Sequence, residues 1–239
     1  MEEGAPIENL EKFTEICHGL PLRGVSSFEH ALLPGIGRGN YLNARKLLAL
    51  EKNTLTIIRR YGAPYLAREY SDLELLTIAQ HHGLKTRLMD WTLNPLVALY
   101  FAVSTGNPTL DAAIYVVTKP PMPLLRPNEN PFTVDESLWV LPAHVTPRIT
   151  AQHALFSIQA SPFEHFTHKH LRKHRIPAQH RNRYVRLLNK WDINEKSLFP
   201  GIDGLAANIN RYALAKLDLP ISGTVGTLNV NSDPPNCSA

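Results

Sequence analysis

The sequence predicts an α+β fold, because helical and strand-like segments are interleaved along one chain and its composition can support a core. With 239 residues, 44% of them apolar, the chain can bury a sizeable core but is short for two full domains. We expect a single domain over residues 1–217 with an N-terminal helix and surrounding helices. We expect a disordered tail over residues 218–239, where Pro, Gly, Ser and Asn accumulate and charged residues become rare.

The elements follow from local patterns taken in chain order. Helices are expected over 7–20 and 41–60, from apolar residues at helical spacing, and over 71–83, from a capping box and a terminal glycine. A buried helix that is apolar nearly all round is expected over 95–103, and a turn with a closing helix over 197–212. Strands are expected where β-branched and aromatic residues cluster or alternate, over 21–25, 84–91, 112–118, 138–141 and 148–160. Residues 1–6 are expected to be frayed. The glycine-rich stretch Pro34–Asn40 matches no phosphate-binding spacing and is expected to be a connection, and Glu51 is expected to be exposed on its helix.

Polar and charged side chains concentrate in an apolar context between Gln80 and Phe101. The segment predicts a helix end, a short strand and the start of a second helix, with Arg87, Asp90, Trp91 and Thr92 at the strand-to-helix turn. The free backbone N–H groups of a helix N-terminus can hold a phosphate at such a turn. The same residue types also form partly buried ion pairs under an aromatic side chain, and residue types alone do not decide between these interpretations.

Charge and cysteine content restrict the classes of function. The net charge of +4 and the pI of about 9.1 allow a nucleic-acid partner without requiring one. Two cysteines provide neither a disulfide framework nor a cysteine zinc site. The acidic first residues and the lack of an apolar segment of ~20 residues argue against a signal peptide or membrane span, so we expect a cytoplasmic protein without a membrane partner.

The segment from His165 to Lys190 contains no Asp or Glu and is rich in basic residues. It predicts a nucleic-acid contact through Lys169, Arg172, Lys173, Arg175, Arg181 and Arg183. A solvated helix face is the alternative interpretation. Its interleaved histidines do not predict a zinc site, because no cysteine partner and no HExxH pattern accompany them.

Four patches together resemble the FRG domain family over residues 20–212. They are Leu22–Gly24, Gln80–Thr92 with Pro95–Ala102, Arg148–Phe156 and Leu198–Leu205. Leu22 stands where the Phe-Arg-Gly motif that names the family has its aromatic residue. The second patch is the most specific of the four.

FRG domains look like distant relatives of the ADP-ribosyltransferases, so the resemblance implies a split β-sandwich with an NAD cleft. Arg23 fits the first motif of those enzymes, Thr86 to Tyr100 the second and Gln152 the third. The catalytic residues that we expect are Arg23, Gln152, Asp90 and His82. The NAD-binding residues that we expect are Arg23, Gly24, Thr86, Arg87, Trp91, Thr92 and Tyr100.

The resemblance therefore implies an NAD-dependent mono-ADP-ribosyltransferase that uses NAD as substrate and no metal. We expect a bacterial toxin or anti-phage effector that modifies RNA or DNA, with a possible neutralising antitoxin protein. Gln152 cannot act as a general base, so either another group, such as His81, His82 or Asp90, activates the acceptor or catalysis is modest. The alternative is a non-catalytic nucleic-acid or protein-binding module with a degenerate NAD cleft.

Overall fold

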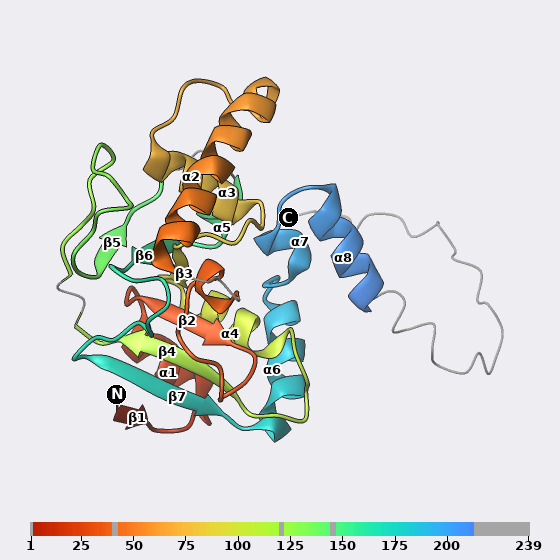
Figure 1. Cartoon of the computed structure of the whole chain (residues 1–239). Coiled ribbons are helices and arrows are strands. Elements are labelled where there is room, and N and C mark those ends of the chain that lie inside the picture. The colour runs from red at the N-terminus through yellow and green to blue at the C-terminus, as the bar shows by residue number, and fades with distance from the viewer. Residues whose placement is uncertain (1, 40–42, 120–121, 144–146, 213–239) are drawn as a thin grey trace, which may run out of the picture.

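The computed structural model describes residues 2–39, 43–119, 122–143 and 147–212, and it has an α+β architecture with a seven-stranded mixed sheet (Figure 1). The strands are β1 (Glu2–Gly4), β2 (Leu22–Val25), β3 (Met89–Thr92), β4 (Ala112–Val117), β5 (Leu138–Val140), β6 (Ala154–Ile158) and β7 (Leu171–Ile176). Their order across the sheet is β1-β7-β4-β2-β3-β6-β5. The predicted fold class is confirmed at the level of α+β.

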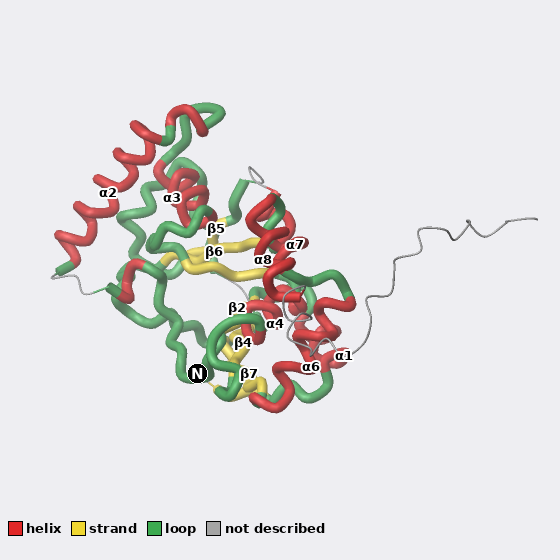
Figure 2. The backbone as a smooth tube through the Cα atoms, turned by 90° about the vertical axis from the view of Figure 1, so that its right-hand side faces the viewer, coloured by secondary structure: helices red, strands yellow, loops and turns green. Residues whose placement is uncertain are grey.

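Helices pack against both halves of this sheet (Figure 2). Over the described ranges, the α-helices are α1 (Leu10–Cys17), α2 (Ala44–Tyr61), α3 (Asp72–His81), α4 (Pro95–Val103), α5 (Pro147–Ala151), α6 (Ala178–Lys190), α7 (Glu195–Leu198) and α8 (Ile202–Tyr212). Helices α1, α4 and α6 share one apolar cluster with β2, β4 and β7. Helices α2 and α3 share another with β5 and β6. No helix in the described part of the chain is both long and apolar enough to cross a membrane.

The sheet is weakly joined at its centre. Strands β2 and β3 share a single residue pair, Leu22 with Thr92, whereas β2 pairs with β4 over all four of its residues. The sheet is therefore divided into one half made of β1, β7, β4 and β2 and another made of β3, β6 and β5. Because the backbones of β2 and β3 diverge beyond their single residue pair, there is room between them for side chains and for a ligand. This place between the two halves of the sheet is called the joint below.

Two local expectations are wrong. Residues 1–6 were expected to be frayed, but β1 pairs in parallel with β7, and Glu2 forms a 2.8 Å ion pair with Arg172. The predicted strand over 148–160 begins as helix α5, and His153 takes a left-handed conformation with φ of 46° before β6 starts. Proline is favoured in the first turn of a helix, which fits the start of α5 at Pro147.

Helices α1, α3 and α4 and strands β2, β4, β5 and β6 lie within the expected ranges, whereas α2 and β3 end one residue beyond theirs. The closing helix expected over 197–212 is divided into α7 and α8, and no strand was expected in the basic segment that forms β7. The strand expected over 84–91 is confined to Met89–Thr92, and the helix that precedes it begins with the expected capping box of Ser71 and Glu74. The expected start of the second helix at Tyr41 and the expected tail over 218–239 lie outside the described residues.

Candidate functional site

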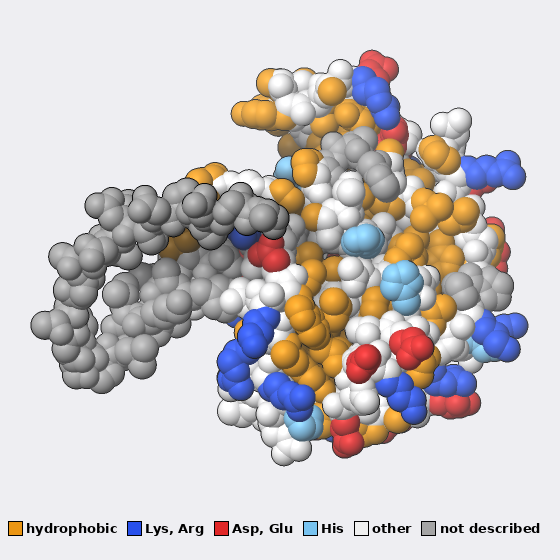
Figure 3. Space-filling model, turned by 180° about the vertical axis from the view of Figure 1, so that it is seen from behind, with side chains coloured by type: hydrophobic (Ala, Val, Ile, Leu, Met, Phe, Trp, Pro, Cys, Tyr) orange, Lys and Arg blue, Asp and Glu red, His pale blue; other side chains and the backbone are white. Residues whose placement is uncertain are grey.

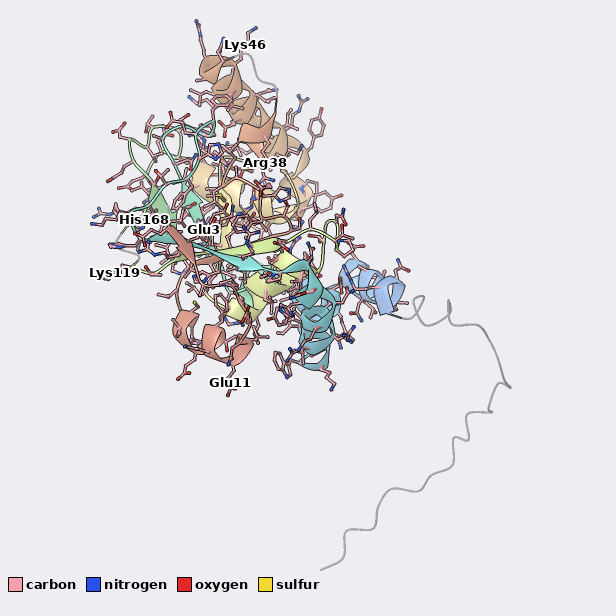
Figure 4. All side chains as sticks on the ribbon, turned by 90° about the horizontal axis from the view of Figure 1, so that it is seen from below. Glu3, Glu11, Arg38, Lys46, Lys119 and His168 are labelled. Carbon is pink, nitrogen blue, oxygen red and sulfur yellow. The ribbon has the colours of Figure 1, made fainter. Side chains whose placement is uncertain are left out.

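A cavity of about 450 Å³ lies at the joint between the two halves of the sheet. Strands β2 and β3, the C-terminal end of α3, helix α4, helix α5 and the loop after β2 all contribute to its wall. The polar side chains that dominate the lining are Arg23, Arg38, His81, Asp90, Arg148 and Gln152. Figure 4 shows Arg38 between α2 and the strands.

Arg23 bridges the two halves of the sheet. It lies on β2, and its Nη1 donates to the backbone oxygen of Asp90 on β3 at 2.5 Å and lies 3.5 Å from the Asp90 carboxylate. Burial lowers the pKa of Arg23, and the nearby Asp90 carboxylate partly opposes that effect. The guanidinium remains charged at neutral pH, so the structure brings a largely buried cation to the joint of the sheet.

Two further arginines face the cavity, and both are anchored on backbone carbonyls. Arg38 donates to the carbonyl oxygen of Leu33 from Nε at 3.2 Å and from Nη2 at 2.9 Å. Arg148 donates from Nη1 to the carbonyl oxygen of His81 at 2.7 Å, and its guanidinium lies 4.4 Å from the ring centroid of Phe199. A carbonyl oxygen carries no net charge, so it fixes a guanidinium without neutralising it.

Asp90 is the one carboxylate among the described lining residues. Gln80 donates from Nε2 to its Oδ2 at 2.9 Å, and Thr86 donates in turn to the Gln80 carbonyl at 2.8 Å. Thr86 was predicted to bind the ligand, but it is buried, lies outside this cavity and instead orients Gln80. Asp90 itself is half exposed and is held at the cavity wall.

Of the two adjacent histidines at the end of α3, His81 lines the cavity and His82 does not. Burial, followed by the charges of Arg148 and His82, lowers the pKa of His81 to about 4, and Asp90 opposes this shift. His81 is therefore neutral at pH 7. The predicted catalytic residue His82 is exposed, caps α3 and contacts the His81 ring edge-on at a centroid distance of 5.3 Å.

Arg87 does not reach the cavity. It donates from Nε and Nη2 to the two carboxylate oxygens of Glu51 at 2.9 and 2.6 Å, and from Nη1 to the Pro131 carbonyl at 3.0 Å. Both side chains of this pair are buried, so the exposed position expected for Glu51 is wrong. The ion-pair interpretation was right for Arg87, but its partner is Glu51 on α2 rather than Asp90.

Two other predicted ligand-binding residues serve packing. A Cβ at Gly24 would collide with the carbonyl oxygen of Ala98, so this glycine permits α4 to lie against β2. Trp91 donates from Nε1 to Ser157 Oγ at 2.8 Å and packs edge-on against Trp139 at a centroid distance of 5.5 Å. The indole is thus committed to the core although Trp91 also contributes to the cavity wall.

The aromatic ring available to a ligand belongs to Phe101 rather than Tyr100. Phe101 is half-buried and lines the cavity, whereas Tyr100 is buried against Phe101 and Phe199. Helix α4 is apolar nearly all round, and so its sequence gave no periodic signal to distinguish the two neighbours.

Gln152 lies at the cavity wall, as predicted for the third motif. Its Nε2 donates to the carbonyl of Leu198 at 3.0 Å, and its own backbone carbonyl accepts from Thr92 Oγ1 at 2.7 Å. The predicted ligand-binding residue Thr92 therefore fixes the turn that carries Gln152. The bond to Leu198 orients the amide, and the side-chain oxygen is the group that Gln152 can offer to a ligand as an acceptor.

The basic segment divides between β7 and α6, and its cations have different environments. Arg181 is buried and donates to four backbone carbonyls, those of Ser26, Thr105, Asn107 and Leu110. Arg172 and Arg175 form ion pairs with Glu2 and Asp111. Backbone carbonyls and distant acidic residues therefore hold three of the six cations that were predicted to contact nucleic acid.

The exposed cations that remain from this segment include Lys169 and three residues of α6, Arg183, Arg186 and Lys190. Figure 3, viewed from behind, shows Lys and Arg side chains grouped over the place that α6 occupies in Figure 1 and elsewhere mixed with acidic ones. In the part of the chain that the structure covers, no group of three or more His, Cys, Asp or Glu residues is arranged to hold a metal ion.

Comparison with known proteins gives one family. The match covers residues 20–110, which include Arg23, Arg38, His81 and Asp90 but not Arg148 or Gln152. No curated protein and no solved structure matches the chain. Residues 20–110 match the family model of the FRG domain, in agreement with the resemblance that the sequence motifs indicate for this part of the chain.

Proposed function

We propose that the chain is an NAD-dependent mono-ADP-ribosyltransferase whose active site is the cavity at the joint of the sheet. The observation that carries this proposal is the pair of arginines Arg23 and Arg148, which face the cavity and are held mainly by backbone carbonyls. Positive charge that is fixed but not neutralised suits a pyrophosphate, the most highly charged part of NAD. The division of the sheet between β2 and β3 supports the split β-sandwich that such a site would use.

The residues present fit the chemistry of the transfer. The bond between C1′ of the ribose and the nicotinamide nitrogen breaks, and nicotinamide leaves with the bonding electron pair. A lone pair of the acceptor then forms the new bond to C1′, and the acceptor releases its proton. Arg23 and Arg148 are placed for the pyrophosphate, Phe101 for the nicotinamide ring, and the side-chain oxygen of Gln152 for a ribose hydroxyl.

The second candidate is a binding module that retains the cleft without catalysis. Gln152 favours it, because a glutamine amide cannot accept a proton from the acceptor as a glutamate can. The roles of toxin or anti-phage effector, and the antitoxin partner, remain predictions that depend on which candidate is correct.

Nicotinamide release separates the two candidates. Purified protein is incubated with NAD that carries a label in the nicotinamide ring, with and without total RNA, DNA and protein, and free nicotinamide is quantified. A transferase releases nicotinamide, and release increases with its acceptor. NAD that binds to the protein but stays intact in every mixture would establish the binding module.

A further inference from the structure

The cavity contains more positive charge than NAD balances. Four lining side chains, Arg23, Arg38, Lys85 and Arg148, are cations at neutral pH, against one carboxylate, Asp90, in the described lining. NAD brings a pyrophosphate but also a positively charged pyridinium ring. The two cations that are exposed, Arg38 and Lys85, are therefore available to a second anionic ligand at the mouth of the cavity.

A loop holds these two mouth cations near each other. The stretch Pro34–Asn40, expected to be a simple connection, contains a turn of 3-10 helix at Ile36–Arg38. Ile36 N donates to the backbone oxygen of Thr86 at 3.2 Å, which fastens the loop to the residue next to Lys85. The position of Arg38 relative to Lys85 is thus set by backbone contacts.

A second cavity of about 330 Å³ shares His30 with the first and contains a buried cation. Lys173 is only 9% exposed, and its Nζ lies 3.9 Å from the ring centroid of Phe28 and 5.3 Å from that of Tyr115. Among the described residues its ammonium group has no hydrogen bond and no ion pair. Burial lowers the pKa of Lys173 and the charges of Glu29 and Glu3 oppose that effect, but neither carboxylate forms an ion pair with it among the described residues, so the ammonium group can donate to an anion from outside the chain.

The register of the sheet connects the two cavities. Arg23 on β2 is opposite Tyr115 on β4, and Tyr115 is opposite Lys173 on β7. Opposed residues of neighbouring strands point to the same face, so the three side chains form one row across the sheet. The Tyr115 hydroxyl donates to the backbone oxygen of His30 at 2.7 Å, which fixes the shared wall between the cavities.

We propose that a single-stranded nucleic acid is the acceptor, and that its phosphates bind at Arg38 and Lys85 and at Lys173 in the second cavity. Several cations along one path match a ligand with repeated negative charge. A cavity of this size admits part of a single strand but not a duplex. Glu29, an exposed carboxylate in the second cavity, opposes the anion there. The role of this ligand as acceptor rests on the proposed function, whereas its binding does not.

The test measures the affinity of labelled single-stranded RNA and DNA by fluorescence anisotropy at several salt concentrations. The double variant Arg38→Gln/Lys85→Gln is compared with the matched double variant Arg183→Gln/Lys190→Gln on α6. Each of them removes one arginine and one lysine. Each phosphate contact contributes about 0.7 to the slope of log affinity against log salt for a single strand, so the first variant should lower the slope by about 1.4. The α6 variant should bind like the wild-type protein.

The second cavity is tested by Lys173→Met, which keeps the length of the side chain but removes its charge. Relative to the wild-type protein, Lys173→Met should lower the salt slope by about 0.7, whereas Lys173→Arg should keep the wild-type slope. Thermal melting checks that both variants are folded. Glu29→Gln, at an exposed position, provides an independent measurement. It should raise the affinity for the nucleic acid, because it removes the carboxylate that opposes the anion.

The proposal is overturned if the Arg38→Gln/Lys85→Gln protein binds with wild-type affinity and salt slope. It is also overturned if the α6 variant loses as much affinity, or if the wild-type protein binds neither nucleic acid. Nicotinamide release by the wild-type protein is measured separately. Binding that depends on the mouth cations without any nicotinamide release would refute the proposed function and leave the phosphate-binding path. Nicotinamide release without such binding would refute the path and leave the proposed function.

Discussion

Replacing Glu51 by glutamine should destabilise the protein by about 3–5 kcal/mol, the usual effect of breaking a buried ion pair from one side. Glu51 accepts both hydrogen bonds of a bidentate pair with Arg87, and the two side chains are 2% and 5% exposed. Glutamine keeps the size of the side chain but removes its charge, so the Arg87 guanidinium is left buried without a counter-charge. For a folded domain of this length the expected fall in Tm is about 6–20 °C.

The matched control is Glu2→Gln, which breaks the ion pair with Arg172 at the surface. Glu2 is 74% exposed there, so the free energy of unfolding should change by less than about 1 kcal/mol. Thermal unfolding followed by circular dichroism at pH 7 compares the two variants. The double variant Glu51→Leu/Arg87→Met should recover much of the lost stability, because an apolar pair needs no counter-charge. A Glu51→Gln protein that melts with the wild-type protein would show that the pair is not buried in solution.

Three further predictions concern the cavity. Arg23→Ala should abolish nicotinamide release in a protein that circular dichroism shows to be folded, and full activity would remove Arg23 from the site. Asp90→Asn should reduce nicotinamide release but change the free energy of unfolding by less than about 1 kcal/mol, because the carboxylate is 55% exposed and 3.5 Å from Arg23; a large fall in Tm would contradict this. Because burial lowers the pKa of His81 from an ordinary 6.5 to about 4, the unfolded chain binds a proton between these values that the folded chain does not, so stability is lost as pH falls through that range. His81→Gln should flatten the dependence of Tm on pH there, and an unchanged dependence would exclude His81 as its source.

Sequence patterns predicted the elements whose stability is local. The β-branched and aromatic residues of Ala112–Val117 and the capping box at Ser71 each specify an element without help from distant residues. Strand β1 has no such pattern, because Glu2–Gly4 is acidic and contains a glycine. It forms because β7 supplies backbone partners and Arg172 supplies a counter-charge, and both lie far along the chain.

The site was predicted in part for the same reason. Arg23 and Asp90 belong to motifs whose order could be recognised, and the structure brings them together. The role of Arg87 could not be inferred locally, because its partner Glu51 is 36 residues away on another helix. Arg38 lay in a loop without a known phosphate-binding spacing, and only the fold shows that the loop borders the cavity.

Under the proposed function, the positive electrostatic potential of the cavity also restricts which groups can act as the acceptor. The cations that suit a pyrophosphate also disfavour protonation of a nearby base, and His81, with burial as the main cause and Arg148 next, has a pKa of about 4. Gln152 offers no carboxylate, and Asp90 is held by Gln80 beside the charge of Arg23. A site with weak bases cannot readily deprotonate an alcohol or a lysine ammonium group. It can, however, position a nucleophile that already has a free lone pair or a negative charge. A nucleobase nitrogen, a phosphate oxygen and a protein carboxylate all meet this condition, so the weak bases disfavour serine and lysine acceptors and are compatible with the proposed nucleic acid.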